Sequence, residues 1–490
     1  MMKGTSCALG LVFLLMTSCN KEFIELTPVS TVSVDVLYKT DKDFQDAVVG
    51  VYSGFRVPYQ NFWQFGDLRG DDTKHDLANG LESIRVDNFL TDYSDNILLT
   101  SWRGYYSIIT NANAVLAKIA NADPAVVTNK DRHIGETKFL RALAYFNLVR
   151  IFGDLPMVTT PITLEAAYQT GREKADKIYD EVIIKDLLDA ETKLPVKYTG
   201  ADVGRATRGA AKALLGKVYL TRKDFVKAEE KLKDVTTLGY VLLKNYNDLF
   251  DYTKDEHHSE YIFDIEYLAG GIGLGSTFTN TFTLEFQSGG KALVDELSRI
   301  YGILTGATAA SGGNPTAGMF AAFDPKDLRK DVSVATGVIG ADGKFVALST
   351  TGVTSFSKKY MAPLKANNDS PANWKVLRYA DVLLMLAEAM NENGKTTEAL
   401  TYLNQVRQRA GLTGYTGLTK DDFREKVYLE RRLELYLEGH RWFDLVRTGR
   451  ALSVMAPFGM KPYMTVFPLP LTELEIIHNP AVFAQNAGYE

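Results

Sequence analysis

The segment ERRLELYLEGHRWFDLVR, residues 430–447, combines an apolar stripe with closely spaced opposite charges. In a helix, three large apolar side chains would share its inward face: Leu433, Tyr436 and Leu437. Four charged residues lie within five positions and offer i,i+3 and i,i+4 pairing along the helix surface: Glu430, Arg431, Arg432 and Glu434. Gly439 can end the helix and let the next residues turn onto the core. We therefore interpret the segment as structural, with His440 packed and hydrogen-bonded rather than catalytic.

Apolar residues recur at spacings of three and four over most of the chain, which predicts a mainly α-helical fold. The first helix should begin near Asp41, with Asp41 or Thr40 as its N-cap. Further helices are predicted at residues 95–121, 131–152, 174–192, 206–221, 224–237, 374–393, 395–410 and 420–437.

Two of these helical pairs match the tetratricopeptide pattern, in which small residues let two helices approach closely. The first pair places Leu215, Gly216, Tyr219, Ala228 and Leu232 at the pattern positions. The second pair places Leu386, Ala387, Met390, Ala399 and Leu403 at the same spacing. Stacked helical hairpins of this kind provide a scaffold for contacts and carry no chemistry. A chance match between two helical hairpins is the alternative.

The stretch at about 240–370 interrupts the helical pattern. It is rich in Gly, Ser, Thr and aromatic residues, and residues 261–267 alternate as a strand would. We expect a long irregular insertion with short strands inside a single domain that spans residues 41–490.

The N-terminus has the order of a secretory signal. Lys3 precedes an apolar run at residues 8–16, and small residues lead to Cys19. The arrangement resembles a bacterial lipoprotein box, so residues 1–18 are predicted to be removed and Cys19 to carry the lipid. Residues 19–40 would form the tether. A signal peptide with an incidental cysteine is the alternative.

The composition limits the function. The chain has 60 acidic and 55 basic residues, and a formal charge of −5, which argues against nucleic acid as the main partner. Catalytic patterns are missing: no Gly-x-Ser-x-Gly elbow is present, and His257-His258 lacks the His-Glu-x-x-His spacing of a zinc site. We predict no catalytic residue, no metal ligand and no cofactor, and leave open a structural calcium ion in the Asp67–Asp76 loop.

Recognition remains, and aromatic rings with planar polar groups in loops are the side chains that bind sugars. Two loop regions have them. Residues 58–76 contribute Tyr59, Phe62, Trp63, Arg69, Asp71 and Asp72, and the insertion contributes Phe282 and Tyr301. Alternatively, Trp63 and Phe65 seat the loop on the first helix. The other three tryptophans, at positions 102, 374 and 442, are expected in the core.

Three more segments join residues 430–447 in a family resemblance. They are GETKFLRALAYFNLVRIFGDLP at 135–156, the stretch from Arg378 to Leu412, and a C-terminal part with FPLP at 467–470 and QNAGY at 485–489. Together they resemble the SusD/RagB family of outer-membrane nutrient-binding lipoproteins of Bacteroidetes. Ala487 stands where the family often has Pro, and Met16 where the lipoprotein box often has Leu.

The resemblance implies a function and a partner. The expected protein is a non-catalytic lipoprotein on the surface of the outer membrane that captures oligosaccharide. It would deliver this ligand to a SusC-like, TonB-dependent transporter, over which it would act as a hinged lid. An oligopeptide cargo, a secreted glycosidase and a repeat scaffold without ligand are the alternatives.

Overall fold

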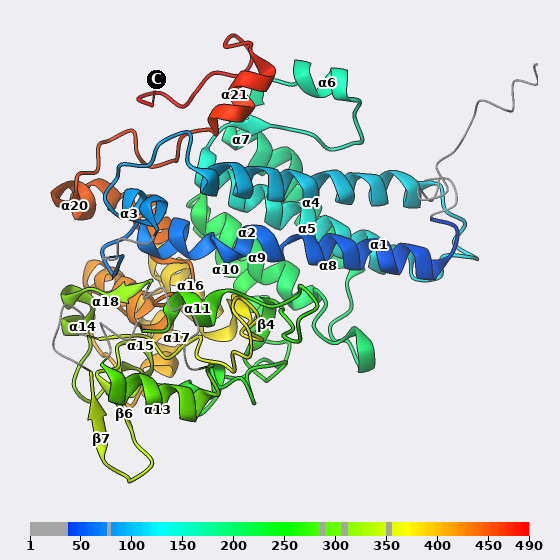
Figure 1. Cartoon of the computed structure of the whole chain (residues 1–490). Coiled ribbons are helices and arrows are strands. Elements are labelled where there is room, and N and C mark those ends of the chain that lie inside the picture. Colours follow the sequence, from blue (N-terminus) through cyan, green and yellow to red (C-terminus); the bar gives the residue numbers. More distant parts are fainter. Residues whose placement is uncertain (1–37, 76–79, 285–289, 305–311, 349–354, 490) are drawn as a thin grey trace, which may run out of the picture.

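The computed structural model describes residues 38–75, 80–284, 290–304, 312–348 and 355–489. Among these residues, helices pair into four hairpins. The pairs are α1 (Asp41–Gly54) with α4 (Asn96–Ala120), α5 (Lys130–Phe152) with α8 (Ile184–Lys193), α9 (Arg208–Thr221) with α10 (Phe225–Val235), and α16 (Tyr379–Glu392) with α17 (Thr396–Arg409). Each of these helices packs against the next, so the hairpins form one continuous stack (Figure 1). The predicted mainly α, tetratricopeptide-like fold is confirmed. The predicted signal peptide and most of the predicted tether, including Cys19, lie outside the described residues.

The two hairpins with the tetratricopeptide pattern lie side by side, because α10 packs on α16 across the sequence gap of the insertion. Within the first hairpin, α9 and α10 approach closely at Gly216, where an added Cβ would lie 2.5 Å from Leu232 Cγ. The small residue is therefore required for this helix spacing, as the pattern predicted. Thr40 caps α1 in a reciprocal arrangement with Asp43.

One predicted helix is wrong over its first five residues. Residues 374–378 form strand β8 (Trp374–Arg378), which pairs antiparallel with β4 (Tyr261–Ile265), and α16 begins only at Tyr379. The partner strand is more than 100 residues away in the sequence, so a local helical pattern could not indicate the pairing.

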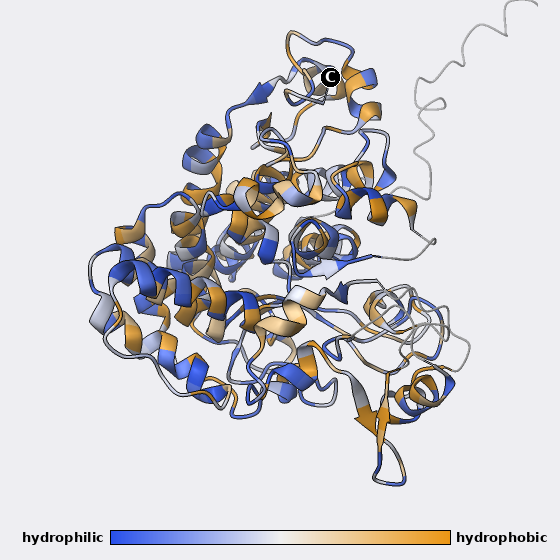
Figure 2. Ribbon diagram, turned by 90° about the vertical axis from the view of Figure 1, so that its left-hand side faces the viewer, coloured by the Kyte–Doolittle hydropathy of each residue, from blue (hydrophilic) through white to orange (hydrophobic). Residues whose placement is uncertain are grey.

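The insertion contains more helix than we predicted. It includes α11 (Phe278–Phe282), α13 (Lys291–Tyr301), β5 (Asn314–Pro315), α14 (Ala317–Ala322), α15 (Lys330–Ser333), β6 (Gly337–Ile339) and β7 (Phe345–Ala347). A second, small hydrophobic core around Leu293, Leu297 and Phe356 holds part of it together. The β6–β7 hairpin projects from the body (Figure 2). The same view shows that hydrophobic and hydrophilic residues alternate along the stacked helices.

The segment at 430–447 forms the end of α18 (Lys420–Glu434), a turn, and α19 (Arg441–Arg447). We predicted ion pairs along the helix surface, and this prediction is wrong: the charged side chains are mostly buried and pair with residues far away in the sequence. Glu434 contacts the guanidinium groups of Arg329, Arg378 and Arg409. Burial alone would raise the pKa of the Glu434 carboxyl, but these three arginines outweigh burial and hold the pKa well below its usual range.

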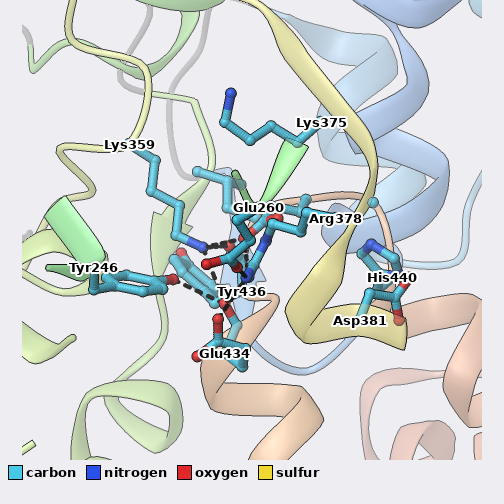
Figure 3. A network of polar contacts seen from close by, with 12 residues as sticks. Tyr246, Glu260, Lys359, Lys375, Arg378, Asp381, Glu434, Tyr436 and His440 are labelled. Atoms are coloured by element: carbon cyan, nitrogen blue, oxygen red, sulfur yellow. Dashed lines mark hydrogen bonds and ion pairs between the residues drawn. The ribbon is translucent and has the colours of Figure 1, made fainter. Parts of the chain in front are cut away.

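The same network extends through the insertion (Figure 3). Glu438 Oε1 lies 2.6 Å from Lys359 Nζ, and Arg378 also reaches Glu260 at 2.9 Å. Opposite charges alternate throughout, and the side chains are almost completely shielded from solvent. The network therefore ties α18 to the insertion and to β4–β8, and offers no accessible acid or base for catalysis.

His440 is packed and hydrogen-bonded, as predicted, with Nδ1 3.3 Å from Lys217 Nζ. Burial, reinforced by the Lys217 ammonium, lowers the pKa of His440 to about 3. The unfolded chain takes up this proton near pH 6.5, so the folded state loses about 1.4 kcal/mol per pH unit as the pH falls below that value.

We therefore expect a His440→Asn variant, which keeps an acceptor for Lys217, to lose about 2 kcal/mol less than the wild type between pH 6.5 and 4.5. Urea unfolding at the two pH values measures the difference. Equal losses in both proteins would show that His440 is protonated in the folded state.

Candidate functional site

The described part of the 58–76 loop, residues 58–75, meets the insertion. It consists of the end of α2 (Arg56–Gln60), a π-helical turn (η2, Gln64–Leu68) and strand β1 (Thr73–Lys74). β1 pairs antiparallel with β5, with Thr73 opposite Pro315. The two regions that we predicted separately as ligand-binding loops are therefore neighbours, joined also by the Thr316 N–H bond to the carbonyl oxygen of Asp72 at 2.8 Å.

The predicted aromatic contacts are core residues in this structure. Tyr59, Phe62, Trp63 and Phe282 are at most 4% exposed. Tyr59 stacks on Phe62 with 4.8 Å between ring centroids, and Trp63 meets Phe282 edge-on at 5.3 Å. Since protein atoms cover these rings, they have no free face for a sugar. Trp63 seats the loop on Phe282 of the insertion, and Phe65 packs on Phe467, so the alternative that both residues seat the loop on the first helix does not describe their positions. Tyr301, at the end of α13, is half-buried against the small core of the insertion.

The predicted polar contacts also hold the loop in place. Asp71 pairs with Arg441 at 2.7 Å, and Asp72 accepts a hydrogen bond from Arg432 Nε at 2.6 Å. Arg69 is buried 3.9 Å from the ring centroid of Phe89, and burial lowers its pKa to about 10. These side chains are committed to protein partners, so in this structure a ligand would have to displace an ion pair to reach Asp71 or Asp72, and the hydrogen bonds to Val86 and Thr91 to reach Arg69.

The three remaining tryptophans, Trp102, Trp374 and Trp442, are buried, which confirms the predicted core positions. Among the residues that the structure describes, no group of three or more His, Cys, Asp or Glu side chains could hold a metal ion. Of the aspartates in the predicted Asp67–Asp76 loop, Asp67 accepts a hydrogen bond from the Gly439 N–H at 2.7 Å.

Beside this loop lies a hollow of about 420 Å³, which we call the polar hollow. Its wall has residues from η2 and its approach, from α3 (Leu81–Asp87) and from the start of α4: Asn61, Gln64, Gly80, Leu81, Glu82, Ser83, Arg85, Asn96 and Ile97. The fold brings them together because α3 packs on η2.

Hydrogen bonds fix the geometry of the polar hollow. Ser83 Oγ donates to Gln64 Oε1 at 2.9 Å. Glu82 accepts from the backbone N–H groups of Asn96 and Ile97 at 2.8 and 3.1 Å, which stabilises the N-terminus of α4. The arrangement presents amide, hydroxyl, carboxylate and guanidinium groups to one space, a combination suited to binding a hydroxyl-rich ligand.

None of these residues was among the predicted ligand contacts. Asn61 and Gln64 lie within the loop that we selected, but the neighbouring aromatic residues drew the prediction. Glu82, Ser83 and Asn96 are polar residues at the beginnings of helices, where capping explains them equally well. No local pattern separates the two roles.

Comparisons with known proteins agree with the fold. Residues 345–485 match a family model described as the SusD family, and residues 22–220 match one described as starch-binding and associating with the outer membrane. The chain belongs to the SusD/RagB family. The predicted resemblance to this family is thereby confirmed.

Relatives within the family align along nearly the whole chain. The SusD-like protein P25 of Formosa agariphila is 29% identical, and the alignment covers 98% of both chains. The starch-binding protein SusD of Bacteroides thetaiotaomicron is 24% identical over 73% of both chains. A solved structure described as a laminarin-binding SusD-like protein superposes with a TM-score of 0.77 and 26% identity, covering 92% of this chain and all of the other.

Proposed function

We propose that this protein is a non-catalytic surface lipoprotein that binds oligosaccharide and passes it to a SusC-like, TonB-dependent transporter. The observation that supports this most is the likeness to the laminarin-binding SusD-like protein over 92% of the chain. The family model described as associating with the outer membrane supports the location. Cys19, outside the described residues, is the proposed lipid attachment. In the described ranges no helix has the length and apolar character needed to cross a bilayer.

We place the first oligosaccharide contacts in the polar hollow. Its groups are those that satisfy paired sugar hydroxyls, and it lies beside the junction of the 58–76 loop and the insertion. Binding should be moderate, because a ligand that is passed on must also be released.

The test is a glycan array that includes laminarin and starch fragments, beside a peptide library. We expect binding to one glycan class, with chromatography of the bound glycan showing its original length. Binding to peptides alone would assign the protein to oligopeptide uptake, and shortened glycan would make it an enzyme. Co-purification of a SusC-like transporter with this protein from outer membranes tests the proposed partner.

The polar hollow has its own test. We expect Asn61→Ala and Ser83→Ala each to weaken binding of the selected glycan by about 1 kcal/mol, roughly fivefold, because each removes one hydrogen-bonding group. Isothermal titration measures the affinity. Asn111→Ala, an exposed amide on α4 outside the hollow, serves as the control and should leave the affinity unchanged. Wild-type affinity in both hollow variants would move the site elsewhere without affecting the proposed glycan binding.

A further inference from the structure

A second and larger depression runs along α4, which we call the α4 groove. Its wider part, about 770 Å³, lies between α4, the segment at 156–170 with α6 (Leu164–Gln169), and α21 (Leu471–Ile477). A narrower part of about 400 Å³ continues toward the α4–α5 turn, where Ala120 and Ile134 line it. Asn113, Thr160 and Pro161 line both parts, so the groove is continuous.

The groove differs from the polar hollow in its chemistry. Apolar side chains on its rim are open to solvent: Ile162 is 43% exposed, Leu164 64% and Ile476 45%. α6 buries none of its residues, although it contains Leu164 and Tyr168. An apolar rim of this kind calls for an apolar occupant, since its exposure to water is unfavourable.

The floor of the groove is held firmly. Asn113 Nδ2 donates to the carbonyl oxygen of Val158 at 2.9 Å, and Arg141 Nη1 donates to that of Thr159 at 2.9 Å. Arg141 is in turn paired with Asp186 at 2.8 Å. Because these bonds fix the outer segment against α4 and α5, the groove exists without its occupant.

The described chain begins at the narrow end of this groove. Tyr38 packs on Phe44 with 5.3 Å between ring centroids, and Asp41 accepts hydrogen bonds from the backbone and side chain of Asn129 at 2.8 Å. Asn129 immediately precedes α5, close to Ile134 in the groove wall. Figure 1 shows the start of α1 beside the end of α4, so the first described residues lie next to the narrow end of the groove.

The sequence before Tyr38 suits an apolar groove. It is PVSTVSVDVL, residues 28–37, in which Val32, Val34 and Val36 alternate with Thr31, Ser33 and Asp35. An extended segment places alternate side chains on one face, so the three valines would face one wall. Ten extended residues span about 33 Å, and α4 from Trp102 to Ala120 spans about 27 Å, so the lengths agree.

We propose that residues 28–37 of this chain lie in the α4 groove. The bound segment acts as a strap between the lipid and the body. With the strap bound, about nine residues, or about 30 Å of extended chain, separate Cys19 from the groove. Without it, about 60 Å of extended chain would separate Cys19 from the body. The body is then held close to the membrane with its α4 side in a defined orientation. The strap is independent of the ligand in the polar hollow.

Disulfide cross-linking in the mature Cys19→Ala chain tests this proposal. Cys7 and Cys19 are the only native cysteines, so the introduced pair would be alone. Ser107 is exposed in the groove wall, about 20 Å along α4 from Ala120, which corresponds to about six extended residues. We expect Ser107→Cys to cross-link with at least one of Val29→Cys, Val32→Cys or Val34→Cys within one molecule.

The control replaces Ser107→Cys by Val226→Cys, a position on α10 that is 70% exposed and outside the groove. A docked segment should react at least about tenfold faster with position 107 than with position 226, because docking raises the local thiol concentration. Equal rates would overturn the proposal. Cross-links that join two molecules in proportion to protein concentration would overturn it too, and would assign the groove to a second copy.

Proteolysis gives a second readout that does not depend on disulfide geometry. We expect elastase to cut within residues 28–37 at least about tenfold faster in a Val32→Asp/Val34→Asp variant than in the wild type, because buried carboxylates would release the segment. Val226→Asp is the control and should not change the cutting rate. Equally fast cutting in the wild type and the variant would contradict docking.

Discussion

Glu434→Gln is expected to lower the free energy of unfolding by about 3–5 kcal/mol, the effect of removing one partner from a buried ion cluster. Glu434 is fully buried and contacts Arg329, Arg378 and Arg409. Glutamine keeps the shape but not the charge, so an unbalanced positive charge would remain in the interior. Urea unfolding at pH 7 measures the loss.

Glu425→Gln is the control on the same helix. The Glu425 side chain is 64% exposed and 3.5 Å from Arg450, so its replacement should change the stability by no more than about 0.5 kcal/mol. The pH dependence adds a second check. Because the arginines hold the pKa of Glu434 below its unfolded value, its contribution is present above about pH 4.5 and is lost as the pH falls. The difference between Glu434→Gln and the wild type should therefore shrink in acid. A constant difference would mean that packing, rather than charge, explains the loss.

The local sequence pattern predicted what depends on local spacing. The helices around Gly216 and Leu232 follow from the 3.6-residue period and from the need for a small residue between close helices. The partners of Glu434 could not be predicted in the same way. Arg329 and Arg378 come from distant parts of the chain, and the spacing along α18 indicated surface pairs instead. A charged residue that is three or four positions from its opposite is compatible with both arrangements.

The candidate site shows the same limit. Aromatic residues in the 58–76 loop predicted a binding surface, because loops usually lie on the outside. This loop instead passes between the hairpins and the insertion, so Trp63 is buried against Phe282. The polar hollow forms only when α3 packs on η2, and no sequence motif predicts this contact.

Gly66→Ala is expected to have the largest effect of any glycine substitution in this loop, lowering the free energy of unfolding by more than about 4 kcal/mol. A Cβ at Gly66 would lie 2.5 Å from both Cα and the carbonyl oxygen of Gly439. These are backbone atoms on the turn between α18 and α19, so no side chain can rotate away. The turn would have to move, and the hydrogen bond from the Gly439 N–H to Asp67 at 2.7 Å would be lost with it.

Gly50→Ala separates this steric effect from the general effect of adding a methyl group. Gly50 lies in α1, and nothing lies within 4 Å of its added Cβ. Neither Gly50 nor Gly66 has a positive φ. Alanine at position 50 should therefore stabilise the protein by up to about 1 kcal/mol, because it favours the helix. If the Gly66–Gly439 contact fixes the loop to the turn, thermal and urea unfolding should show that Gly66→Ala is less stable than the wild type and that Gly50→Ala is more stable. If the free energy of unfolding of Gly66→Ala lies within about 1 kcal/mol of the wild-type value, the loop and the turn are not in backbone contact. The position of the polar hollow beside them would then lose its structural basis.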